Sequence, residues 1–230
     1  MNDFHENDKL CFIDSNKNPI GSDSFDVLEA LQNEIHKYRQ ISFSVDSNNK
    51  KGFDLHQMWG LYAEKGEGVC FVFDYNELER TLDTNIIHSK ISYEENIDSF
   101  VVSMSEEPNN VPNEIQKNVR HIFFHKRKEW EHEQELRILK RCPVSNKEEY
   151  IQYGSSLKYI ILSSKLQDVD EILFYQRIKD LKCCANVLIL IYGNGLLEYS
   201  LYNWEDGKLI WNSSEGYDIL TPGVNCKLDV

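Results

Sequence analysis

The chain has 230 residues and a hydrophobic content of 41%, which is enough to build a substantial core, so we expect one folded domain over residues 1–230. Its 25 basic and 38 acidic side chains give a formal net charge of −13, which disfavours broad electrostatic binding to nucleic acid or to an anionic membrane. A specific contact with nucleic acid as a local substrate stays open.

Two further features indicate where such a protein would work. No segment approaches the roughly 20 apolar residues that a membrane-spanning helix needs, and the N-terminus has no secretory pattern, so we expect a cytoplasmic protein. The six cysteines show no Cys-x-x-Cys spacing, which indicates free thiols rather than a disulfide framework or a zinc site.

Helices and short strands alternate in the first two thirds of the chain. Residues 69–73 form a continuous apolar run, typical of a strand covered on both faces. Residues 114–130 carry the longest helical pattern, after a loop at 106–113. The other expected elements are a helix after Ser24 that runs to Tyr38, a strand at 40–45, helices at 55–64 and 75–82, and strands at 86–93 and 133–140.

The final third continues the alternation with strands at 157–162 and 187–192 around a helix at 169–181. Two further apolar runs flank Asp206-Gly207, and this dipeptide is a strong hairpin signal because both turn positions require a positive φ. The sequence therefore predicts an α+β fold with a central mixed sheet flanked by helices, in which residues 195–230 form a C-terminal β-hairpin and tail.

The best polar constellation is Glu133, Glu135 and Arg137. Side chains two apart on a strand project to the same side about 7 Å apart, close enough for both carboxylates to share one substrate. The neighbouring arginine would keep them ionised or grip a phosphate. The same pattern is also typical of a solvated strand face on which the arginine simply pairs with its glutamates.

Aromatic residues precede a glycine-rich turn earlier in the chain. Trp59 and Tyr62 are three apart on one helical face, and Gly66 and Gly68 would let the backbone approach a ligand closely. The pair would form a wall for a flat ring. Core packing before a buried strand is the other interpretation.

A third pattern, His121 and His125 with Glu129, superficially resembles a helical metal pair. Ile122 stands where the zinc-protease motif has a glutamate, so we expect no metal and a solvent-facing histidine stripe instead. The basic run 125–128 is interpreted as the solvated C-terminal end of the helix.

Two blocks of the sequence resemble motifs of a prokaryotic family of domains of unknown function, family 2971. The first is Met58-Trp59-Gly60-Leu61-Tyr62-Ala63 followed by the Gly-Val-Cys strand, and the second is Trp130 to Arg137 in the pattern Trp-x-x-Glu-x-Glu-x-Arg. Residues 2–6 are similar to the family's Asn-Asp turn, and residues 157–163 to its strand before a helix. The family name supplies no settled activity.

The order of these motifs is similar to that of the split β-fold of ADP-ribosyltransferases. By this resemblance Glu135 would stabilise the charge that develops as the nicotinamide–ribose bond of NAD breaks, and Glu133 would orient the accepting nucleophile. Trp59 or Tyr62 would pack on the nicotinamide, and Arg137 would contact a phosphate or pair with the glutamates. NAD is the implied cofactor, with no metal.

The sequence departs from the family pattern at two places. Many members have a histidine where Leu61 stands, and the chain starts almost at the Asn-Asp turn, so the strand that usually precedes this turn is expected to be absent. The first hypothesis is thus an NAD-dependent ADP-ribosyltransferase-like toxin or phage-defence component. The alternative is a non-catalytic protein-interaction module of a defence or toxin–antitoxin system, in which an antitoxin or another defence component is the partner and the acidic surface meets a basic one.

No P-loop, dinucleotide fingerprint or Gly-x-Ser-x-Gly elbow occurs in the sequence, which argues against P-loop nucleotide hydrolysis and ordinary serine hydrolysis. A sugar- or nucleotide-cleaving hydrolase that uses Glu133 and Glu135 is a third hypothesis, and it requires a second carboxylate on an opposing element.

Overall fold

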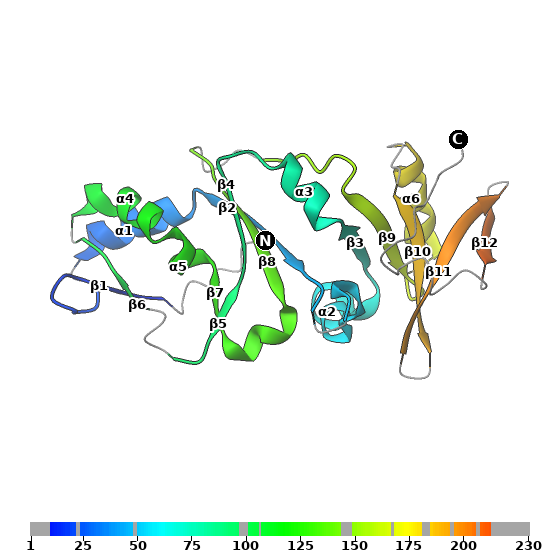
Figure 1. The fold of residues 1–230 in the computed structure, drawn as a ribbon, viewed down its shortest axis with the longest axis horizontal. Coiled ribbons are helices and arrows are strands. Elements are labelled where there is room, and N and C mark those ends of the chain that lie inside the picture. Colours follow the sequence, from blue (N-terminus) through cyan, green and yellow to red (C-terminus); the bar gives the residue numbers. More distant parts are fainter. Residues whose placement is uncertain are drawn as a thin grey trace. The chain divides into compact units, whose positions relative to one another are not determined.

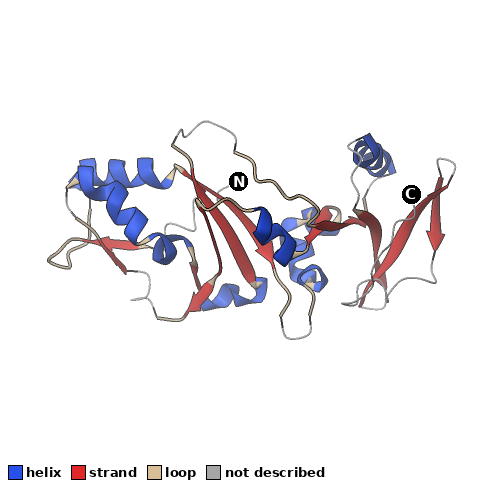
Figure 2. Cartoon of the chain, turned by 45° about the horizontal axis from the view of Figure 1, so that its top comes forward, coloured by secondary structure: helices blue, strands red, loops and turns tan. Residues whose placement is uncertain are grey.

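The computed structural model describes residues 10–21, 24–47, 50–96, 101–105, 107–143, 149–166, 168–180, 185–193, 196–205 and 208–212. Helices and strands are mixed along these residues, which confirms the predicted α+β class (Figure 2). The chain divides into two units: unit 1 comprises Met1–Gly52 and Asp83–Tyr150, and unit 2 comprises Phe53–Leu82 and Ile151–Val230. The expected single domain over residues 1–230 stays a prediction.

Unit 1 is built on a three-stranded antiparallel sheet in the order β2-β8-β4 (Figure 1). Two parallel strand pairs, β1 with β6 and β5 with β7, accompany it. The strands are β1 (Cys11–Ile13), β2 (Tyr38–Ser44), β4 (Ile86–Lys90), β5 (Ser92–Glu94), β6 (Val101–Ser103), β7 (His125–Arg127) and β8 (Glu135–Arg141). The strand expected at 86–93 is therefore divided between two sheets, because it leaves the β8 ladder after Lys90 and pairs with β7 from Ser92.

The helices of unit 1 enclose its core. Helix α1 (Phe25–Ile35) and helix α4 (Val111–Lys117) lie side by side (Figures 1 and 2). Val27 and Leu31 of α1 are buried. Tyr38 was expected on the same helix, but it begins β2 and packs its ring 4.7 Å from that of Phe123.

The prediction of one long helix at 114–130 is wrong. The segment instead contains the end of α4, a short helix α5 (Val119–Phe123), strand β7 and a 3-10 helix η7 (Lys128–Glu133), after the 3-10 turn η6 (Pro108–Asn110). Helix α4 ends at Asn118, because the backbone there leaves helical geometry (φ −101°, ψ 12°) while the side-chain amide donates to the Glu114 carbonyl at 3.0 Å. The apolar residues that recur at helical spacing in this segment are nevertheless buried on both sides of the break, at Ile115 and Ile122, so the sequence shows helical periodicity across it.

Unit 2 contains a five-stranded sheet in the order β12-β11-β10-β9-β3. Its strands are β3 (Val69–Phe73), β9 (Leu157–Ser163), β10 (Asn186–Gly193), β11 (Leu196–Glu205) and β12 (Lys208–Asn212). Strands β9 and β10 are parallel, and the other neighbours are antiparallel. The predicted C-terminal hairpin is confirmed by the pairing of Glu205 with Lys208, while its Asp206-Gly207 turn lies outside the described residues.

Helices cover both faces of this sheet. Trp59 of α2 (His56–Tyr62) and Ala63 form one apolar cluster with Ile161 and Leu190, and α6 (Asp168–Asp180) contributes Phe174 and Ile178 to another on the opposite face. The remaining helical pieces are η3 (Gly52–Asp54), η4 (Glu64–Gly66) and α3 (Tyr75–Thr81).

Strand β3 was expected to be covered on both faces, and this is wrong at its centre. Phe71 is 49% exposed, because β3 is the last strand of the sheet and α6 covers it only in part. Among the helices of the described part, none has the length and apolar character that crossing a membrane requires.

Candidate functional site

The polar residues singled out in the second motif form a buried cluster in unit 1. We call Lys126, Glu133, Glu135 and Arg137 the ionic network; their exposed fractions are 6%, 2%, 4% and 3%. Glu135 and Arg137 share one face of β8, as the period of two predicted. The solvated face considered for Glu133, Glu135 and Arg137 is wrong, since all three are buried, although Arg137 does pair with Glu135.

Glu133 does not lie on the strand. It ends η7, and Gln134 separates it from β8 with a left-handed backbone (φ 46°, ψ 52°), a conformation that costs energy for any residue other than glycine. This turn brings Glu133 back toward β7, where its Oε2 lies 2.6 Å from the Lys126 Nζ. The position of the Glu133 carboxylate is therefore set by this turn and by Lys126, and not by the alternation of side chains along a strand.

The Glu135 carboxylate is surrounded by donors from this chain. Arg137 donates through Nε to Oε1 at 2.5 Å and through Nη2 to Oε2 at 3.1 Å. The Ser42 hydroxyl donates to Oε1 at 2.6 Å, and the Lys126 Nζ lies 2.8 Å from Oε2. Each carboxylate oxygen thus has two donors, which fills the four sites that an ionised carboxylate offers.

These contacts decide the charge of Glu135. Burial raises the pKa of its carboxyl, but the hydrogen bonds and charge of Arg137, together with Lys126 and Ser42, outweigh burial and hold the pKa below its ordinary value. The network contains two cations and two carboxylates, so it is electrically balanced within the protein interior.

Backbone contacts tie the network to two other segments, the end of α5 and residues 91–93. The Arg137 Nη1 donates to the Phe123 carbonyl at the end of α5 at 2.6 Å. The Glu135 N–H donates to the Tyr93 hydroxyl of β5 at 2.8 Å, and the Ile91 N–H donates to the Glu135 carbonyl at 2.9 Å. The network therefore holds α5, β5 and β8 in place.

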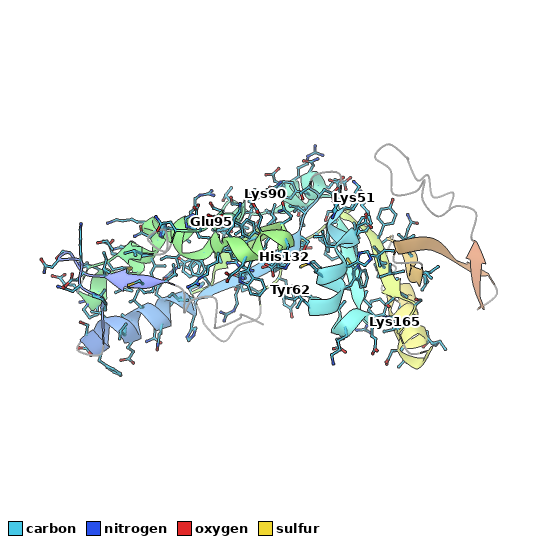
Figure 3. All side chains as sticks on the ribbon, turned by 90° about the horizontal axis from the view of Figure 1, so that it is seen from below. Lys51, Tyr62, Lys90, Glu95, His132 and Lys165 are labelled. Carbon is cyan, nitrogen blue, oxygen red and sulfur yellow. The ribbon has the colours of Figure 1, made fainter. Side chains whose placement is uncertain are left out.

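Sequence reasoning missed Lys126, which was assigned to a solvated helix end. Its Nζ lies 5.7 Å from the centre of the Trp130 ring, close enough for a cation–π contact. Trp130 in turn stacks on His132 with ring centres 6.0 Å apart, and Figure 3 labels His132 on η7. No signal in the sequence distinguishes the buried Lys126 from its exposed neighbours Arg127 and Lys128.

The two aromatic candidates of the first motif belong to unit 2. Trp59 is 3% exposed, lies among the aliphatic side chains of the sheet and donates through Nε1 to the Phe53 carbonyl at 2.7 Å. Tyr62 is 64% exposed at the end of α2 (Figure 3). One ring thus packs in the core and the other projects outward. Contact of either ring with nicotinamide stays a prediction.

The histidine pair is packed rather than arranged as a solvent-facing stripe. The rings of His121 and His125 meet edge to face with centres 4.8 Å apart, and the Nε2 of His121 is buried without a hydrogen bond. Within the described segments, no group of three or more histidine, cysteine, aspartate or glutamate side chains is arranged to hold a metal ion.

Comparison with known proteins confirms the family resemblance. The model of a family described as "Protein of unknown function (DUF2971)" matches residues 58–138, about a third of the chain. The match begins at the Met-Trp motif of α2 and ends inside β8, so it includes both motifs and the whole ionic network. No curated protein and no solved structure matches the chain.

Proposed function

We propose that this protein is a non-catalytic interaction module that binds a protein partner. The observation that carries the proposal is the state of Glu135, the best candidate for catalysis. Its carboxylate already accepts from Ser42, twice from Arg137 and from Lys126. A catalytic carboxylate needs an oxygen within hydrogen-bond reach of its substrate, and here each donor would first have to be displaced.

The other candidates of the two motifs support the same proposal. Glu133 is 2% exposed and paired with Lys126, and Arg137 is 3% exposed with its guanidinium bonded to Glu135 and to a backbone carbonyl. The Trp59 ring is part of a core. Buried, mutually satisfied charges of this kind fix the conformation of the segments that carry them.

The surface of unit 2 offers apolar side chains to a partner. Large apolar residues at a surface supply contact area to a partner. Among the described side chains of unit 2, the exposed ones are Leu61, Tyr62, Phe71, Tyr75, Tyr153, Ile172 and Leu173. These side chains offer apolar contact, and the net charge of −13 favours a partner that is basic. The cytoplasm is the location that we assign to this interaction, and a defence or toxin–antitoxin system is its setting, with an antitoxin or a second defence component as the partner.

One observation favours the alternative, NAD-dependent ADP-ribosyl transfer. Gln134 holds a strained left-handed conformation between the two motif glutamates, and such strain clusters at functional sites. In that mechanism Glu135, held ionised, stabilises the positive charge on the ribose, and Glu133 orients the acceptor. Arg137 contacts a phosphate, and Trp59 or Tyr62 packs on the nicotinamide.

One assay separates the two functions. The purified chain is incubated with NAD and with candidate protein and nucleic-acid acceptors, and the release of nicotinamide is measured. We expect none above the rate without protein, and no heat of NAD binding by calorimetry. Release by the wild type that disappears in a folded Glu135→Gln variant, but persists in Glu131→Gln, would overturn the proposal in favour of the transferase.

A further inference from the structure

Strand β3 has one open edge. Among the strands of the described part, β3 pairs only with β9, and it is the last strand of its sheet. The Ser163 N–H donates to the Gly68 carbonyl at 3.2 Å, so Gly68 directs its carbonyl toward β9. Because backbone groups alternate in an antiparallel ladder, Cys70 and Val72 also bond toward β9, while Val69 and Phe71 direct their N–H and C=O groups outward.

This edge lacks two of the features by which natural sheets avoid pairing with another chain. The sequence Val-Cys-Phe-Val-Phe contains no charged residue and no proline, and both are common protections of edge strands. The ladder shifts register between Val72 and Phe73, which limits the regular edge to the residues before the shift. A docked strand would therefore centre on the outward groups of Val69 and Phe71.

Exposed aromatic rings lie beside the same edge. Phe71 is 49% exposed, and its ring centre lies 6.3 Å from that of Phe174 on α6. Tyr153 is 47% exposed and meets the ring of Phe73 edge to face at 6.2 Å. An added strand would form hydrogen bonds along the edge and pack an apolar side chain against these rings.

Charge identifies the chemistry of the occupant. The segment 53–82, which contains β3, has six acidic residues and only two basic ones. Glu64 and Glu67, which precede the strand, are exposed. A second copy of this chain would bring the same negative charge and be repelled, whereas lysine or arginine in a peptide would be attracted.

We infer that the open edge of β3 binds an extended peptide of basic and apolar residues, which adds to the sheet as a further strand beyond β3. The inference rests on the proposed function, since it names the surface and the partner class of the interaction module. Main-chain hydrogen bonds to Val69 and Phe71 supply affinity, and contact with the Phe71 and Phe174 rings selects an apolar side chain.

The experiment uses the full chain and a fluorescein-labelled heptapeptide in which lysine alternates with valine and phenylalanine. Binding is followed by fluorescence anisotropy. One control peptide has glutamate in place of lysine, and a second carries N-methyl groups on the amides that would pair with the edge. We expect each control to bind about tenfold more weakly, because the first loses charge attraction and the second loses the strand hydrogen bonds.

Two variants of the protein locate the site. Phe71→Pro removes the outward N–H without removing a bond to β9, because that N–H faces away from the ladder, and proline is accepted on edge strands. Phe71→Ala keeps the N–H and removes only the ring. We expect Phe71→Pro to abolish peptide binding and Phe71→Ala to weaken it, with unchanged circular dichroism for both.

Three results would overturn the inference. Equal binding of the N-methylated peptide would mean charge attraction without strand addition. Absence of binding up to about 1 mM, the weakest affinity of interest, would mean that the edge does not accept a peptide. If the chain self-associates and Phe71→Pro abolishes this self-association, the edge binds a second copy of the chain instead of a peptide. These results are independent of the test of the proposed function. That function fails if the chain releases nicotinamide from NAD, whether or not the peptide binds.

Discussion

At the scale of single residues, Glu135 is the side chain on which the ionic network depends. Its carboxylate contacts both Arg137 and Lys126. Glu135→Gln keeps the shape and removes the charge, which leaves two buried cations with one carboxylate. We expect a loss of about 3–5 kcal/mol in the free energy of unfolding, as when one partner of a buried ion pair is removed.

The matched control is Glu131→Gln, four residues earlier. Glu131 pairs with Lys128 at 2.7 Å, but both side chains are 45% exposed. We expect a change within about 0.5 kcal/mol, because exposed ion pairs contribute little to stability. Urea denaturation of both variants measures the difference, and equal losses would show that burial of the network has no special energetic role.

Two glycines, Gly60 inside α2 and Gly68 in the turn that precedes β3, give a second pair of variants. A methyl group on Gly68 would lie 2.9 Å from the Cα of Ala63, whereas one on Gly60 would meet nothing within 4 Å. We expect Gly68→Ala to destabilise the protein by about 1–3 kcal/mol through overpacking. Gly60→Ala should stabilise it by about 0.5–1 kcal/mol, because Gly60 lies inside a helix. Thermal melts of both variants test this, and loss of stability in Gly60→Ala would contradict it.

The sequence located part of the candidate site. Glu135 and Arg137 were paired correctly, because alternation along a strand is a local property. Trp59 and Tyr62 were placed on one helical face, and at three residues apart they are indeed separated by only about 60° around the axis. The boundary between the buried and the exposed side of α2 falls between these two residues. Only the packing of α2 on the sheet decides which ring is buried, and the sequence of the helix does not contain that information.

At the scale of elements, the sequence predicted a helix or strand correctly where a single local pattern was strong. The Asp-Gly pair predicted the hairpin of β11 and β12, and the apolar run 157–162 predicted β9. The helix at 114–130 failed because its buried apolar residues recur at helical spacing across both α4 and α5. Asn118 and the pairing of β7 with β5 interrupt the backbone, and the second of these is a contact between remote segments that periodicity cannot show.

Helix capping gives a prediction for two elements. Asp74 precedes α3, and its Oδ1 accepts the N–H of Glu77 at 3.0 Å. Ser24 holds the same position before α1, but its side chain makes no capping hydrogen bond. We expect Asp74→Ala to lower the free energy of unfolding by about 1 kcal/mol and Ser24→Ala to leave it nearly unchanged. Chemical denaturation compares the two variants, and the reverse order would show that the Asp74 bond is not a stabilising cap.

At the scale of the whole molecule, the buried carboxylates with lowered pKa that we identify belong to unit 1. Besides Glu135, Glu34 of α1 is 1% exposed, with Arg141 at 2.5 Å and Lys37 at 2.8 Å. Burial raises the pKa of Glu34, but the hydrogen bonds of Arg141 and Lys37 outweigh it and leave the pKa lowered. In unit 2, the pKa of Glu77 is lowered by its hydrogen bonds to Lys158 and Ser155, but its side chain is 33% exposed, so solvent screens that interaction.

This distribution predicts that acid weakens unit 1 first. A carboxyl whose pKa is lower in the folded state stabilises the fold fully above its ordinary pKa of 4.5, and this stability is lost as the pH falls through the folded pKa. Methyl NMR signals of Ile122 in unit 1 and Ile161 in unit 2, followed from neutral pH downward, report on each unit. We expect the Ile122 signal to lose its native position at the higher pH, and in Glu135→Gln at a higher pH still. Loss of the Ile161 signal first, or of both signals together, would show that the buried carboxylates of unit 1 do not control acid unfolding.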